Sequence, residues 1–309
     1  MFEFYFPHYI INEPNSIIEN LLISLVATFI AFLGAFYISS ITVRKQKTIE
    51  LEKQRLLYKN RLTYFSNLIT NSLEIVEKQL VNYEKLAAEI KEEPTEIHLL
   101  KMNASTDLSR LQRMDSEGIF SSYNEIIKES ENKLKDYKNI YNTIDFIYLR
   151  VKQAIDSNEK YIGFLHRDQM YIKDKIDGLS DELIKVIKAI ESHGCSFKDT
   201  VEYNFTTAWQ SKYYELVEKQ ETIGGIETEL MLPYAELLQS EHSQKNYFPI
   251  LYDFTSKSLV RYTHLRRNTN QFAIELENIR SEMKESVEIL NEINEKIKLA
   301  IVNYPNKQE

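Results

Sequence analysis

The chain has 309 residues, a net charge of −8 and 43% hydrophobic residues, but only 7 glycines and 6 prolines. An α/β enzyme or a β-sandwich needs a turn roughly every ten residues, and turns draw on Gly and Pro, so the scarcity of both predicts an all-α fold of long helices. The single cysteine, Cys195, excludes an intrachain disulfide framework and a Cys-rich zinc site, and the acidic balance gives no global electrostatic footprint for nucleic acid.

Residues 21–43 form an apolar run, LLISLVATFIAFLGAFYISSITV, in which Tyr37 is the one ionisable side chain. A helix of this length crosses a hydrocarbon core of roughly 30 Å, and the run is too long for a signal peptide and lacks a basic segment before it. We therefore expect one transmembrane helix. Every Lys and Arg lies at or after Arg44. By the positive-inside rule, residues 1–20 form a short extracytoplasmic tail and the rest of the chain is cytoplasmic, at the inner (cell) membrane.

A face of small residues runs along this segment, and small residues let two membrane helices approach closely. We expect the lipid bilayer and further copies of the chain as partners, with helix packing through Ala27, Ala31, Gly34 and Ala35. A single span cannot enclose a pore, so conduction would need several subunits around an axis. The hydroxyl residues that would then line it are Ser24, Thr28, Ser39 and Ser40.

Residues 44–93 contain no proline, so the membrane helix is expected to continue into a long juxtamembrane helix that Pro94 ends. From Tyr58 to Ile90 the apolar residues recur every three or four positions, which is the spacing of a coiled-coil or bundle helix. The stripe is wider than a two-position seam, which favours packing inside a bundle. The basic group Arg44, Lys45 and Lys47 reflects topology rather than recognition of a specific lipid.

Residues 94–309 are predicted to form a helical cytoplasmic domain that packs on this helix. A short polar segment with candidate caps at Ser105, Thr106 and Asp107 comes first, followed by a loop near 115–118. Helical spacing then extends from Ser121 to about Asp177. Gly178 is predicted to end that helix, and the next, 179–194, is predicted to end at Gly194.

The last part of the chain divides into an irregular stretch and a regular one. Residues 195–249 contain Trp209, a Gly–Gly pair, Pro233 and Pro249, which indicates short helices. From Phe254 to about Val302, a second long apolar stripe predicts a helix whose other face is charged.

Motifs that would carry chemistry are missing. The sequence has no Gly-rich phosphate loop, no dinucleotide fingerprint, no HExxH and no Gly-x-Ser-x-Gly elbow. The Arg-to-His spacing of the HEPN ribonucleases is also absent. No cofactor or metal is expected, and nucleotide or nucleic-acid binding is not indicated.

Two groups of polar residues remain open to more than one interpretation. The adjacent residues His166, Arg167 and Asp168 offer an acid, a base and a cation, but consecutive helical residues point in different directions. A basic cluster near the start of the last helix is a candidate site for a phosphate, an anionic headgroup, an RNA backbone or a protein partner. The alternative is a solvated face paired internally with carboxylates. The cluster comprises Arg261, His264, Arg266 and Arg267.

These observations favour a membrane-anchored helical protein that works by binding and homo-oligomerisation, as an effector or a sensor. The plan of an anchor followed by a helical domain resembles bacterial membrane proteins implicated in abortive phage infection; the resemblance is one of architecture, and it implies an effector of the abortive-infection or pore-forming type. A structural tether at the inner membrane is the first alternative. An uncharacterised helical enzyme, such as a nuclease using His166, Arg261 or His264, is the second, and the chain is more readily understood as a non-enzyme.

Overall fold

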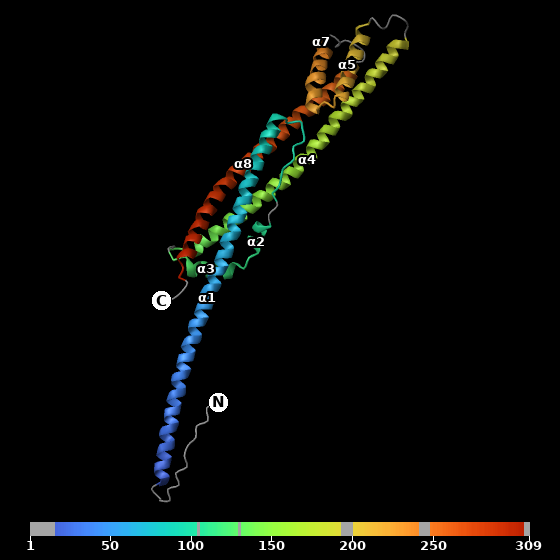
Figure 1. Ribbon diagram of the computed structural model, residues 1–309. Helices are drawn as coiled ribbons and strands as arrows, with labels where there is room; N and C mark the ends of the chain where they lie inside the picture. The colour runs from blue at the N-terminus through green and yellow to red at the C-terminus, as the bar shows by residue number, and fades with distance from the viewer. Residues whose placement is uncertain (1–15, 104–105, 129–130, 193–199, 241–247, 306–309) are drawn as a thin grey trace.

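The structure, a computed structural model, describes residues 16–103, 106–128, 131–192, 200–240 and 248–305. Most of these residues are helical and none is in a strand, which confirms the all-α prediction (Figure 1). In chain order the elements are α1 (Ser16–Glu92), α2 (Asp107–Arg113), α3 (Ser116–Ile126), α4 (Lys133–Ser192), α5 (Val201–Glu218), α6 (Ile223–Ile226), the π-helical turn η2 (Glu227–Met231), α7 (Leu232–Ser240) and α8 (Phe248–Asn303).

Helix α1 runs without a break for 77 residues, from the apolar segment into the body of the protein. It is the one described helix that is long and apolar enough to cross a membrane, and no part of its apolar window is buried. From Leu62 onward one side of α1 becomes buried, and the helix ends two residues before Pro94, as predicted. Residues 44–57, called the stalk below, therefore lie between the apolar segment and the buried part of the same helix.

Three long helices build the body, because each has an apolar stripe several turns long that must be covered. Helix α8 packs along both α1 and α4, while α2 and α3 lie against α1 (Figure 1). A buried polar contact joins α1 to α8. The Asn294 side chain accepts a hydrogen bond from Ser66 Oγ at 2.7 Å and donates one to Thr70 Oγ1 at 2.9 Å. A buried amide that needs these partners fixes the register of the two helices.

The predicted continuous helix from Ser121 to Asp177 is wrong at its start. Helix α3 ends at Ile126, and α4 begins at Lys133 after the chain reverses. The Asn132 side chain accepts a hydrogen bond from the backbone N–H of Lys135 at 3.2 Å, as an N-cap does. The predicted loop at 115–118 is also shorter than expected, because Asp115 caps α3 by accepting from the N–H of Gly118.

The predicted helix end at Gly178 is also wrong, since α4 continues through this residue to Ser192. A Cβ atom at Gly178 would lie 2.8 Å from Cε1 of Phe254 on α8. The glycine therefore allows a close approach of two helices, and the buried Leu179 and Leu183 carry the apolar stripe past it. Gly194, the other predicted helix end, lies outside the described residues.

Residues 200–240 form α5, α6, η2 and α7, here called the head, at the end of the body away from the apolar segment (Figure 1). α6, η2 and α7 are short, as predicted, whereas α5 is longer than predicted, with 18 residues. Pro233 does not end the helical path, because the wider π turn before it gives room to a proline ring that lacks an N–H. Helix α8 begins six residues earlier than predicted, with Pro249 in its first turn, where proline is tolerated.

Candidate functional site

The basic cluster predicted on α8 is divided among different surroundings. Arg261 donates a hydrogen bond from Nη2 to Oδ1 of Asp168 on α4 at 2.5 Å, and the Asp168 side chain is 3% exposed. The guanidinium of Arg261 also lies 5.2 Å from the ring centroid of Tyr171, at cation–π distance. Arg261 thus neutralises a buried carboxylate of the neighbouring helix.

Arg266 has the equivalent role one and a half turns later. Its Nη2 atom lies 2.6 Å from Oε2 of Glu227, whose side chain is 4% exposed and belongs to the π turn. Burial raises the pKa of the Glu227 carboxyl above its usual range, and the guanidinium of Arg266 opposes that shift. The two arginines therefore attach α8 to α4 and to the head.

The remaining two residues of the predicted cluster, His264 and Arg267, are exposed. His264 lines a recess of about 300 Å³ between α4 and α8, together with Tyr171, Lys257 and Arg261. Lys257 is paired with Asp253 at 2.7 Å. The structure thus brings Arg261 and His264 together and separates them from Arg266, and anion binding by this group stays a prediction.

The residues His166, Arg167 and Asp168 point in different directions, as helical geometry requires. Asp168 is buried beside Arg261, whereas His166 and Arg167 are exposed, although Nε of Arg167 lies 3.9 Å from Oδ1 of Asp168. No hydrogen bond joins His166 to Asp168 in the part of the chain that the structure describes. The geometry supplies no proton relay at this position.

The head contains a larger and more apolar pocket, of about 430 Å³, which sequence reasoning did not single out. It lies between α5 on one side and η2 and α7 on the other. The residues that line it are Val201, Asn204, Phe205, Ala208, Trp209, Glu229, Leu230, Pro233, Tyr234 and Leu237. The sequence signal was the concentration of aromatic residues, glycines and prolines in one irregular stretch, but nothing in the spacing showed that they enclose a space.

Aromatic stacking forms much of the pocket wall. The rings of Phe205 and Tyr234 stack with centroids 4.8 Å apart, and Trp209 lies 5.6 Å from Tyr234 in a tilted arrangement. On its other side Trp209 stacks on Tyr213 at 5.2 Å. The indole N–H of Trp209 is buried and makes no hydrogen bond within the described residues. Interlocked rings of this kind hold a wall in one shape.

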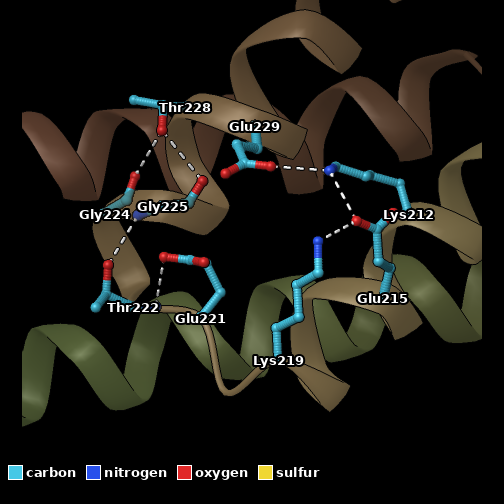
Figure 2. Close-up of polar contacts among 9 residues, drawn as sticks. All are labelled: Lys212, Glu215, Lys219, Glu221, Thr222, Gly224, Gly225, Thr228 and Glu229. Atoms are coloured by element: carbon cyan, nitrogen blue, oxygen red, sulfur yellow. Dashed lines mark hydrogen bonds and ion pairs between the residues drawn. The ribbon is translucent and has the colours of Figure 1, made fainter.

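Polar contacts lie around the pocket, and one of them joins its two sides (Figure 2). Lys212 of α5 reaches across to Glu229 of η2 at 2.8 Å and also lies 3.5 Å from Glu215. Lys219 pairs with the same Glu215 at 2.5 Å. At the base, Thr222 caps α6 by accepting a hydrogen bond from the N–H of Gly225 at 3.1 Å. Of these contacts, the bridge from Lys212 to Glu229 joins α5 to η2 across the pocket.

The predicted membrane-packing residues Ala27, Ala31, Gly34 and Ala35 are all exposed, and a Cβ atom at Gly34 would meet nothing within 4 Å. Two of the candidate pore hydroxyls bond to their own helix. Thr28 Oγ1 donates to the carbonyl of Ser24 at 2.7 Å, and Ser40 Oγ donates to the carbonyl of Tyr37 at 2.8 Å. Apart from Ser40 and Ile41, which are partly buried, the residues of the segment 21–43 are exposed within one chain.

Among the described residues, no group of three or more His, Cys, Asp or Glu side chains gathers as metal ligands would. Comparisons of the chain with protein-family models, with curated proteins and with solved structures find no match.

Proposed function

We propose that this protein is a membrane-anchored assembly protein: the segment 21–43 crosses the inner membrane, copies associate through it, and the cytoplasmic body acts by binding. One observation carries the proposal. Helix α1 is continuous from the apolar segment to the core of the body, so the two are parts of one rod. Any pairing of the segments in lipid is then transmitted to the bodies without a flexible linker.

The orientation of α1 supports this proposal. At about 3.6 residues per turn, Ala31 and Ala35 lie on the side of α1 opposite to Phe65 and Val76, which face the core of the body. Two helices that meet through the alanine face therefore carry their bodies on the outside of the pair, where the bodies do not obstruct contact.

The stalk extends the same face beyond the lipid. By the same count of residues per turn, Ile49 and Leu56 lie on the alanine side, and they are 51% and 59% exposed. Apolar side chains seven residues apart on a bare helix gain free energy when a second helix covers them. A parallel partner anchored in the same membrane would bring the matching residues of its own stalk to this position.

The test is association of the full-length chain in lipid vesicles, measured as energy transfer between copies labelled at the C-terminus. Ala31→Leu together with Ala35→Leu should lower the transfer several-fold, because added methyl groups separate backbones that must touch. The matched control is Val26→Leu with Ile30→Leu, which adds little bulk on the other side of the helix and should behave as the parent. Equal transfer in the parent and in both variants would rule out this interface.

Ion leakage on overexpression then distinguishes the two forms of the proposal. An effector whose assembled spans open the membrane releases ions from the cell, whereas a tether that only holds partners at the membrane does not. Loss of leakage in the Ala31→Leu, Ala35→Leu variant would connect the opening to the assembly.

A further inference from the structure

The head pocket has the size and lining of a small-molecule site. Its volume of about 430 Å³ lies within the roughly 300–1,000 Å³ of typical ligand pockets. Apart from Asn204 and Glu229, every residue that lines it is apolar or aromatic. We propose that this pocket binds a small, uncharged molecule with an apolar body and one hydrogen-bonding group.

Exposed apolar surface at the pocket supports binding of an apolar body. Val201 is 59% exposed and Leu237 is 38% exposed, on opposite sides of the recess. A ligand that fills the space removes both side chains from water, and apolar area removed from water is the main favourable term in such binding.

The polar residues of the pocket indicate that the ligand is neutral. The carboxylate of Glu229 is already neutralised by Lys212 at 2.8 Å, as Figure 2 shows, so a cationic ligand would have to displace an existing partner. The amide of Asn204 offers one acceptor oxygen and a two-hydrogen donor group, beside the hydroxyl of Tyr234 and the indole N–H of Trp209 in the same lining. It is suited to a hydroxyl, carbonyl or amide group on an otherwise apolar molecule.

The pocket is held open by contacts that exist without a ligand. The stacked rings of Phe205 and Tyr234 and the bridge from Lys212 to Glu229 join its two walls. One wall is a π turn, and such turns occur frequently at functional sites because they cost stability relative to a regular helix. A preformed pocket binds with little loss of conformational entropy.

The inference goes beyond the proposed membrane assembly and does not depend on it, because no residue of α1 lines the pocket. A protein that fails to associate in lipid still has this site. Conversely, loss of ligand binding leaves the association through Ala31 and Ala35 unaffected.

The chain contains one tryptophan, and it lines the pocket, which provides a direct reading of occupancy. The probe is dansylamide, a neutral aromatic sulfonamide that accepts excitation energy from tryptophan. It is titrated into full-length protein in phosphatidylcholine vesicles. Helix α5, which carries Trp209, lies at the opposite end of the molecule from the apolar segment (Figure 1), so probe dissolved in the bilayer contributes little transfer.

We expect saturable energy transfer from Trp209 in the parent. Ala208→Phe fills the pocket from an exposed position on α5 and should weaken the apparent affinity at least about tenfold, with helical content and melting temperature unchanged. Asn204→Phe is a second filling variant, which decides the outcome if the first does not fold. Ser211→Phe adds the same ring at an exposed α5 position that does not line the pocket and should bind as the parent does.

Two results would overturn the inference. The first is an absence of saturable energy transfer from Trp209 in the parent protein, which would mean that the pocket does not bind the probe. The other is an unchanged affinity in the folded filling variants, which would place the probe elsewhere on the protein.

Discussion

At the scale of single residues, two arginines of α8, Arg261 and Arg266, pair with buried carboxylates. Asp168 and Glu227 are each less than a twentieth exposed and each has an arginine of α8 within 2.6 Å. Burying a carboxylate without a partner costs far more free energy than leaving it in water. Each of the two arginines therefore offsets the burial of the carboxylate with which it pairs. This explains why a basic cluster occurs beside a helix junction.

The pair of Glu227 and Arg266 gives the first stability prediction. Replacing Arg266 by Met leaves the Glu227 carboxylate buried without a partner. We expect a loss of roughly 1–3 kcal/mol near pH 7, less than for a fully enclosed pair because 41% of the Arg266 side chain is exposed. The measurement is denaturant unfolding of the fragment from Arg44 onward.

The same pair predicts how that loss depends on pH. The folded state already raises the pKa of Glu227, mainly by burial, and removal of Arg266 raises it further. A folded state that binds the proton more tightly than the unfolded state loses stability as the pH rises through the interval above the ordinary Glu pKa. The Arg266→Met deficit should therefore shrink near pH 5. If the loss of stability were equal at pH 5 and pH 7, Glu227 would not be its cause. The control is Arg267→Met, at an exposed position, whose free energy of unfolding should stay within about 0.5 kcal/mol of the parent.

At the scale of helices, the apolar stripes of α1 and α8 behave as the sequence predicted. Phe65 is fully buried and stacks on Tyr141 of α4 with ring centroids 5.9 Å apart, and Ile279 is 2% exposed on α8. Truncating either residue to Ala leaves a cavity in the contact between long helices and should cost roughly 2–5 kcal/mol.

Chemical unfolding of the fragment from Arg44 onward checks this prediction. The control is Glu285→Ala, on the solvent-exposed side of α8. Its free energy of unfolding should stay within about 0.5 kcal/mol of the parent. Were Phe65→Ala and Ile279→Ala both to unfold together with the parent, the three-helix frame would be incorrect.

Helix boundaries were the part of each element that the sequence described least well. Gly178 has the usual identity of a helix end, yet α4 passes through it because Phe254 needs the space that a side chain would occupy. Asn132 caps the start of α4, but the apolar spacing on both sides of it concealed the end of α3. At Gly178 the local helix-end signal lost to packing, whereas at Asn132 the local cap prevailed over the apolar spacing.

At the scale of the whole molecule, the arrangement of charges along α1 predicts the topology. All Lys and Arg residues follow the apolar segment, beginning at Arg44, so the body should be cytoplasmic and the chain before the segment external. A protease added to intact spheroplasts should spare the body, and a reporter fused after Glu309 should behave as cytoplasmic. If Cys195, which lies outside the described residues, were labelled from outside without permeabilisation, the predicted orientation would be wrong.

The sequence by itself determined the helical class, the apolar segment, the continuity of α1 up to Pro94 and the two stripes that form the frame. These properties follow from composition and from spacing along one helix, which are local quantities. Only the tertiary structure decided that Arg261 and Arg266 meet buried carboxylates and that α5, η2 and α7 enclose a pocket beside Trp209. Such contacts join residues far apart in the chain, and their geometry depends on how helices pack, which no spacing within a single helix records.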